Sequence, residues 1–397
     1  MSNGPRRPWT FALGLIAGIA VAVALLAFVG PLQDLLPESG KQTRAAEAQQ
    51  VIEDSYFRPA DSEELQNASI NGMVKRISAA NDDKFSHYFD PATYKRFQAS
   101  SSGEFSGIGV TVTEAKKGLR VAQVFDGAPA EDANIGPDDL IVAADGKQLA
   151  GVSADAAAAR IKGPAGTSVE LTVIDGASGK RRQVEVERAN VKVPAVAGRI
   201  ERVDGHDVAY VSLAGFTRGA HGELRSEIEK LDRRGAEGLV FDLRGNGGGL
   251  VDEAVLVQSI FQKEGPVLTI EGRTRDKQTF DVTGEPLEDI GPIAVLVDGN
   301  TASASEIVTA ALKENDLATV IGTRTYGKGV FQQVIPLDNG GALDFTVGQY
   351  FLPSGRNIGG RGVARGKGLK PDVRAADKQA TERDEALDRA LDVLGSA

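Results

Sequence analysis

The chain has 397 residues, enough for two or three domains, and its 47 glycines and 41% apolar content are typical of a globular protein. Its formal charge of −10 argues against binding to nucleic acid, because non-specific binding needs a basic surface and no DNA- or RNA-binding motif offsets the charge. Cysteine is absent, and His87, His206 and His221 lie far apart, so the sequence offers no thiolate chemistry, no disulfide and no clustered metal ligands, and we expect no cofactor.

The N-terminus carries the clearest physical signal for a membrane segment. Residues 9–29 are almost all apolar, which meets the requirement of about 20 residues for a helix across a bilayer. Arg6 and Arg7 precede this stretch, so the positive-inside rule predicts a cytoplasmic tip, with everything after residue 35 outside the cytoplasmic membrane. We favour an uncleaved signal anchor over residues 1–35. A cleaved signal peptide is the alternative, but the stretch is longer than an ordinary h-region and no clear A-x-A site follows.

Residues 40–102 are predicted to form a small helical region. Apolar residues recur with helical spacing between positions 45 and 80. The stretch DDKFSHYFDPATYKRF (82–97) closes this region, and its aromatic side chains are expected to pack on a neighbouring element. SSSGEFSG (100–107) then reads as a linker or the start of a strand.

Residues 103–190 are predicted to form a compact mixed domain, with strand–strand–short helix–strand–helix–strand–strand separated by turn glycines. The run GAPAEDANIGPDDLIVAADGKQL and the preceding FSGIGV resemble a PDZ domain. The resemblance implies a peptide carboxylate-binding loop at Gly107, Ile108, Gly109 and Val110. In such a loop, successive backbone N–H groups bind a terminal carboxylate while the peptide adds as a strand to the sheet edge.

From residue 191 to 375 strand and helix patterns alternate. Examples are the strand GLVFDLRG (238–245), the helix GLVDEAVLVQSIFQ (249–262) and the helix SASEIVTAALKEN (303–315). VLTI, VFQQVIPL and ALDFTVGQYFL continue the series, which predicts an α/β core with crossovers on a largely parallel sheet. An amphipathic helix is expected in the C-terminal segment 376–397.

NTASASEI (300–307) contains three hydroxyl residues before a helical pattern. Ser303 followed by Glu306 reads as a capping box, and this is the structural alternative to a nucleophile. Ser303 and Ser305 are two positions apart, so on a helix they point about 200° away from each other and only one can face a catalytic partner. We expect Ser305 to be a surface or packing hydroxyl.

Two glycine-rich stretches complete the candidate chemistry. GTRTYGKG (322–329) is one residue short of a P-loop, but Gly329 replaces the Mg²⁺-binding hydroxyl and a strand follows where a helix is needed, so nucleotide binding is disfavoured. In DLRGNGGG (242–249), backbone N–H groups at a strand-to-helix turn can stabilise an oxyanion, whereas a tight turn with paired Asp242 and Arg244 is the alternative. A serine, a desolvated lysine and glycine N–H donors are the parts of acyl transfer without histidine or cysteine.

Five motifs in order resemble the C-terminal processing peptidases, serine proteases of family S41. They are DDKFSHYFDP (82–91), DLRGNGGGL (242–250), NTASASEI (300–307), TYGKGVFQ (325–332) and PSGRNI (353–358). The resemblance implies a ClpP/crotonase-like α/β peptidase core with an inserted PDZ domain. It also implies site residues: Ser303 as nucleophile, Lys328 as general base, Gln332 to orient the lysine, and an oxyanion hole from the N–H groups of Ala304 and Gly249, with Gly248 as the alternative.

The implied function is a membrane-anchored serine endopeptidase that recognises protein C-terminal tails and cleaves outside the cytoplasmic membrane. Its partners would be protein substrates with apolar C-termini and the membrane through the N-terminal helix, and not nucleic acid. The resemblance also implies a homodimer and gating of activity by the PDZ domain, and an activating partner would remain to be identified. The alternative from another class is a catalytically silent PDZ adaptor, which would not need Ser303, Lys328 and Gln332.

Overall fold

The computed structural model describes residues 43–360, 362–363, 365–376 and 383–395. The predicted membrane segment at 9–29 lies outside these residues. Within the described part, no helix is both long and apolar enough to cross a membrane. The chain divides into two compact units, residues 1–73 and 74–397.

The predicted N-terminal helices are present as α2 (Arg44–Ser55) and α3 (Ser62–Ala80), and the first unit ends within α3. Thr43 caps α2, because its side chain accepts a hydrogen bond from the N–H of Ala46. Large apolar side chains of these helices are exposed, including Val51 at 58% and Met73 at 57%. After α3, the second unit continues with β1 (His87–Phe89), followed by α4 (Pro91–Ser101).

The PDZ-like part has the predicted order of elements, with one short strand added. Its elements are β3 (Val110–Ala115), β4 (Gly118–Val124), α5 (Pro129–Asp132), β5 (Leu140–Ala144), β6 (Lys147–Gln148), α6 (Ala154–Ile161), β7 (Ser168–Ile174) and β8 (Arg181–Glu187). The strands form an antiparallel sheet in the order β3-β4-β5-β7-β8. Strands β2 (Glu104–Gly107) and β9 (Ala189–Lys192) pair where the chain enters and leaves this part. Ile108, Leu119, Ile141 and Leu171 are fully buried in its core.

The predicted parallel α/β sheet is confirmed for six strands in the order β10-β11-β12-β15-β16-β19. They are β10 (Val196–Val203), β11 (His206–Leu213), β12 (Leu239–Asp242), β15 (Ile293–Val297), β16 (Thr319–Gly322) and β19 (Val373–Arg374). Only β10, at one edge, runs antiparallel to its neighbour. The central strands are buried on both faces, which explains their continuous apolar sequences.

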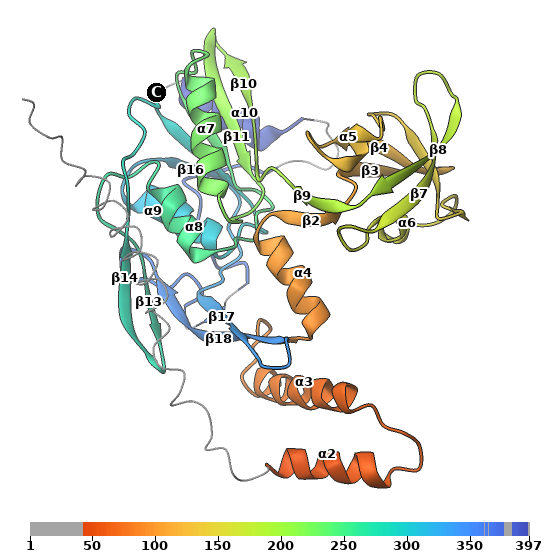
Figure 1. Ribbon diagram of the computed structural model, residues 1–397. Coiled ribbons are helices and arrows are strands. Elements are labelled where there is room, and N and C mark those ends of the chain that lie inside the picture. Colours follow the sequence, from red (N-terminus) through yellow and green to blue (C-terminus); the bar gives the residue numbers. More distant parts are fainter. Residues whose placement is uncertain (1–42, 361, 364, 377–382, 396–397) are drawn as a thin grey trace, which may run out of the picture. The chain divides into compact units, whose positions relative to one another are not determined.

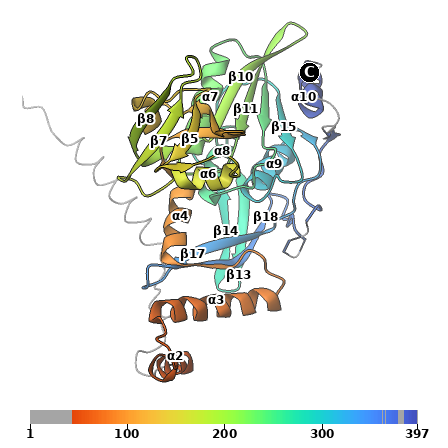
Figure 2. The ribbon, with the colours of Figure 1, turned by 90° about the vertical axis from the view of Figure 1, so that its right-hand side faces the viewer.

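Helices cover both faces of this sheet (Figures 1 and 2). Alternate side chains of the strands, such as Phe241 and Val295, pack against α7 (Ala220–Asp232), α8 (Val251–Gln258) and α9 (Ala304–Glu314). The intervening side chains, such as Val240 and Leu296, pack against α10 (Glu385–Gly395), which confirms the predicted C-terminal helix. The period of two along each strand therefore divides the core into two layers.

The expectation that all later strands continue the parallel series is wrong. The strands β13 (Pro266–Gly272), β14 (Arg275–Asp281), β17 (Val330–Pro336) and β18 (Ala342–Phe351) form a separate antiparallel sheet with β1. Between β17 and β18 lies only a tight turn, in which the N–H of Leu337 donates to the carbonyl of Gly341. A parallel pair needs a crossover of a dozen or more residues, so this short connection can only make a hairpin.

Candidate active site

Three of the sequence motifs meet at one edge of the parallel sheet. DLRGNGGG begins in β12, NTASASEI follows β15, and RTYGKG follows β16. These three strands are adjacent and parallel, so their carboxyl ends lie at the same edge, which is where ligand and active sites form in open α/β sheets.

Ser303 lies at the N-terminus of α9 in an unusual backbone conformation. Its φ of 58° and ψ of −119° are rarely adopted by a residue with a side chain, and such strain concentrates at functional sites. The helix N-terminus favours negative charge nearby. Ser305 is fully buried, and its hydroxyl donates to the carbonyl of Asn246 at 3.0 Å, which confirms it as a packing hydroxyl.

Glu306 joins the serine segment to the lysine segment. Its carboxylate is fully buried and accepts hydrogen bonds from the N–H of Ser303 at 3.0 Å, the N–H of Gly327 at 2.8 Å, the N–H of Lys328 at 3.0 Å and the hydroxyl of Thr325 at 2.5 Å. Burial raises the pKa of Glu306, and these four hydrogen bonds oppose that shift. One carboxylate therefore holds the backbones of Ser303 and Lys328 together.

Lys328 is partly buried beside Gln332. Its ammonium donates to Oε1 of Gln332 at 2.7 Å and lies 4.6 Å from the centre of the Phe85 ring. Among the described residues, no hydrogen bond joins its Nζ to Ser303. Desolvation lowers the pKa of Lys328, and three nearby carboxylates only partly counteract this. A lysine whose pKa is lowered in this way is suited to accept a proton.

The glycine-rich loop lies against the serine. A Cβ atom on Gly248 would stand 2.9 Å from both the backbone nitrogen of Ala304 and Cβ of Ser303, so only glycine fits there. The N–H of Gly248 donates to Oδ1 of Asn246 at 2.8 Å. In the part of the chain that the structure describes, the N–H groups of Gly249 and Ala304 have no acceptor. These two donors, and not that of Gly248, are therefore available for an oxyanion.

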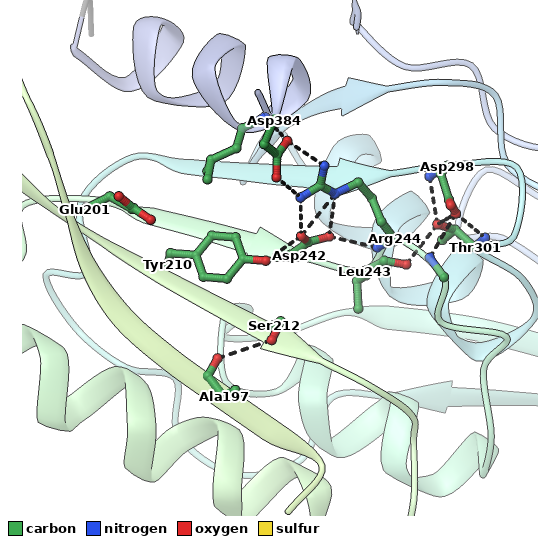
Figure 3. A network of polar contacts seen from close by, with 12 residues as sticks. Ala197, Glu201, Tyr210, Ser212, Asp242, Leu243, Arg244, Asp298, Thr301 and Asp384 are labelled. Carbon is green, nitrogen blue, oxygen red and sulfur yellow. Dashed lines mark hydrogen bonds and ion pairs between the residues drawn. The ribbon is translucent and has the colours of Figure 1, made fainter. Parts of the chain in front are cut away.

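The alternative predicted for this loop, a structural pair of Asp242 and Arg244, is present. Figure 3 shows Arg244 between Asp242 and Asp384, with donor–acceptor distances of 2.7 and 2.8 Å from its Nη2. Tyr210 donates to the same Asp242 carboxylate at 2.7 Å. Although burial opposes it, the hydrogen bonds that Arg244 donates to both carboxylates raise its pKa, so it stays charged. The network ties the start of the glycine loop to the residue before α10.

The predicted carboxylate-binding loop connects β2 and β3 in the PDZ-like part. Gly107 ends β2, Val110 begins β3, and Ile108 is buried between them. Gly109 has φ of 78°, and a Cβ there would stand 2.2 Å from Cβ of Ala128. Across the described ranges, no acceptor is found for the N–H groups of Ile108 and Gly109. Two successive free donors are the feature that binds a carboxylate.

Sequence reasoning missed two residues of this site. Glu306 was interpreted only as half of a capping box, although it also binds the segment 325–328. Asn246 lies inside a motif but received no role. Its side chain donates to the carbonyl of Leu213 at 2.7 Å, and its own carbonyl accepts the N–H of Ala302 at 3.0 Å. An asparagine in a strand-to-helix turn was the available signal.

Known families and proteins match the chain over most of its length. A family model described as peptidase family S41 matches residues 207–375, and one described as a PDZ domain matches residues 106–188. A carboxy-terminal-processing protease of Bartonella bacilliformis is 36% identical over 81% of this chain and 72% of its own length. A CtpA-like serine protease of Staphylococcus aureus is 32% identical over 81% of this chain, which spans 62% of that relative. The solved structure of a photosystem II D1 C-terminal processing protease has a TM-score of 0.50 and 26% identity, covering 88% of this chain and 96% of that one.

Proposed function

Because the chain belongs to the S41 family of carboxy-terminal-processing serine proteases, we propose that Ser303 is its nucleophile and Lys328 its general base. The observation that carries this proposal is the bridge made by the Glu306 carboxylate, which accepts both the Ser303 and the Lys328 N–H. The lowered pKa of Lys328 supports the role of base.

The proposed reaction uses these groups in two steps. Neutral Lys328 accepts the hydroxyl proton of Ser303 as its Oγ attacks the peptide carbonyl, and the oxyanion is stabilised by the N–H groups of Ala304 and Gly249. Lys328 then returns the proton to the leaving amine, which leaves an acyl-enzyme at Ser303. Lys328 next takes a proton from a water molecule as the water attacks the acyl-enzyme ester. It passes that proton to Oγ of Ser303 as the ester C–O bond breaks, which releases the new C-terminus. In the structure Lys328 contacts Gln332, and catalytic hydrogen bonds often tighten only in the substrate complex.

For substrate choice, the proposal is that the PDZ domain binds an apolar C-terminal tail. The free N–H groups of Ile108 and Gly109 support capture of the carboxylate. Partly buried apolar residues on β3 and α6, among them Val110, Val112 and Ala158, support an apolar side chain next to it. The adaptor alternative shares this step but requires no chemistry at Ser303.

The cellular setting remains a proposal from the sequence. The apolar stretch at 9–29 after an arginine pair supports a single-pass anchor with the catalytic body outside the cytoplasmic membrane. Exposed apolar residues of α2, such as Val51 and Ile52, support the proposed homodimer, because such surface is commonly buried by a partner. Fusion reporters placed before residue 9 and after residue 35 would test the orientation.

The experiment that tests the function is a digestion time course with the full chain. Two matched protein substrates, one with a free apolar C-terminus and one with that end amidated, are incubated with wild type, Ser303→Ala and the neighbouring Ser305→Ala. We expect the wild type to cleave the free-tail substrate rapidly and to leave the amidated substrate intact. Ser305→Ala should keep this activity, and Ser303→Ala should abolish it. Undiminished cleavage by Ser303→Ala would refute the nucleophile, and binding without cleavage by wild type would favour the adaptor.

A further inference from the structure

A segment from before the PDZ domain forms part of the surroundings of Lys328. Strand β1 pairs with β18, with His87 opposite Asp344, and this pairing places the preceding residues 82–86 beside β17 and β18. The Phe85 ring lies over the Lys328 ammonium, and the N–H of Thr346 in β18 donates to Oγ of Ser86 at 2.9 Å. The family motif DDKFSHYF therefore has a position at the site but no role so far.

A continuous chain of hydrogen bonds runs from Lys328 to Asp83. Lys328 Nζ donates to Oε1 of Gln332 at 2.7 Å, Nε2 of Gln332 donates to Oγ1 of Thr346 at 3.2 Å, and Oγ1 of Thr346 donates to Oδ1 of Asp83 at 3.2 Å. Gln332 and Thr346 are direct neighbours across the β17–β18 pair. The chain thus crosses from the catalytic hairpin to the segment before the PDZ domain.

The direction of this chain follows from its far end. An ionised carboxylate can only accept hydrogen bonds. Although burial alone would raise the pKa of Asp83, hydrogen bonds from Ser86, Phe85 and Thr346 outweigh it and hold that pKa below its ordinary value. The Thr346 hydroxyl must therefore give its proton to Asp83 and accept from the Gln332 amide nitrogen. The carbonyl of Gln332, which is otherwise free to exchange places with its nitrogen, then faces Lys328.

We propose that Asp83 and Thr346 are positioning residues that hold the Gln332 carbonyl toward Lys328, so that the lysine lone pair remains free for the Ser303 proton. The inference rests on the proposed function of Ser303 and Lys328. With the amide reversed, Nε2 of Gln332 would donate to that lone pair and compete with the serine. Asp83 reaches the reaction through two intervening side chains and touches no reacting atom.

Several charged or titratable groups face Lys328, and they fix the expected sign of a pH effect. Three of them are carboxylates that raise the pKa of Lys328: Asp344 of β18, Glu306 of α9 and Asp83. In addition, His87 faces Asp344, and the Tyr350 hydroxyl donates to the Lys328 carbonyl. Loss of Asp83 removes an attractive charge, and loss of Thr346 removes the fixed carbonyl acceptor for the ammonium. Both changes disfavour the charged lysine and lower its pKa.

The test compares Thr346→Val, which removes the hydroxyl at nearly constant shape, with Thr346→Ser, which keeps it. Asp83→Asn is compared with Asp82→Asn, a change at the adjacent exposed carboxylate, which lies 3.9 Å from Lys84. We expect kcat to fall about tenfold or more in Thr346→Val and Asp83→Asn, with KM within about twofold, because general-base catalysis contributes about 10²–10⁴-fold. The rising limb of the kcat–pH profile should also move to lower pH. Thr346→Ser and Asp82→Asn should match wild type.

A second readout does not depend on turnover. Competitive acetylation of lysines over a pH series, followed by peptide mass spectrometry, reports the titration of Lys328 in each full-length variant. The midpoint should move to lower pH in Thr346→Val and Asp83→Asn only. A loss of packing alone would reduce kcat without shifting the titration midpoint of Lys328. If Ser303→Ala is inactive, either this result or a Thr346→Val variant with the kcat and the midpoint of wild type would overturn the inference. If Ser303→Ala still cleaves, the proposed function itself fails, and the inference fails with it.

Discussion

Replacing Glu306 with glutamine should damage both stability and catalysis. The carboxylate accepts four hydrogen bonds at 2.5 to 3.0 Å, two on each oxygen. An amide has one oxygen, so in either orientation its NH₂ group faces two of the four donors. A buried donor left without an acceptor costs about 1–3 kcal/mol, so the free energy of unfolding should fall by about 2–6 kcal/mol. That is a large share of the roughly 5–15 kcal/mol that stabilises a typical domain.

The catalytic effect follows from the same contacts. Oε2 of Glu306 accepts the N–H groups of both Ser303 and Lys328, so an amide nitrogen at that position would release both. A shift of about 1 Å in such a site can cost about 100-fold in rate. Urea unfolding followed by circular dichroism measures the first effect, and tail-dependent cleavage measures the second. Glu229→Gln, at a carboxylate of α7 with 40% exposure, is the control and should change stability by no more than about 0.5 kcal/mol. A Glu306→Gln protein that unfolds within about 1 kcal/mol of wild type and cleaves at a similar rate would refute the reasoning.

Gly248→Ala should reduce kcat in the cleavage assay by about 10²-fold or more, because the added methyl group collides with the backbone nitrogen of Ala304. The control Gly247→Ala should cleave normally, because no atom lies within 4 Å of the added Cβ. Ser305→Ala should lower the free energy of unfolding by about 1 kcal/mol through loss of one buried hydrogen bond, and cleavage should persist. Asp384→Asn should weaken the Arg244 network by about 1 kcal/mol or less, because the Asp384 side chain is 39% exposed and solvent screens the pair, and urea unfolding would detect a larger role if one exists.

Much of the fold follows from local patterns in the sequence. The 3.6-residue period identified α8, α9 and α10, and a continuous apolar run identified β12, because a buried face leaves a regular pattern of apolar residues in the sequence. The second sheet could not be recognised in this way. A strand such as β18 carries no local mark of its partners, and it pairs with β1 from more than 250 positions earlier in the chain as well as with β17 next to it.

For the candidate site too, the sequence predicted the residues in local motifs but not the contacts between distant residues. Ser303 and Lys328 lie in short motifs whose residue types suggest chemistry, so the sequence alone was enough to single them out. The contacts that hold them together join residues far apart in the chain. Asn246 binds the turn at Ala302, Glu306 binds Lys328, and Asp83 binds Thr346. Capping-box spacing predicted only the local half of what Glu306 does, because a side chain's distant partners depend on the tertiary fold.

The PDZ domain lies in the sequence between two residues that contact each other at the site, Asp83 and Thr346. Asp83 precedes that domain and Thr346 follows it, yet β1 is fixed to β18 by backbone pairing at His87, Tyr88 and Phe89. The positioning contact to Gln332 therefore depends on a strand pair that belongs to the peptidase sheet itself. The inserted domain can vary in sequence without altering the orientation of Gln332, as long as β1 keeps its register. A shift of that register by one residue would turn each side chain of β1 to the opposite face of the sheet and carry Asp83 away from Thr346. The register of this three-residue strand is thus a requirement of the proposed chemistry as well as of the fold.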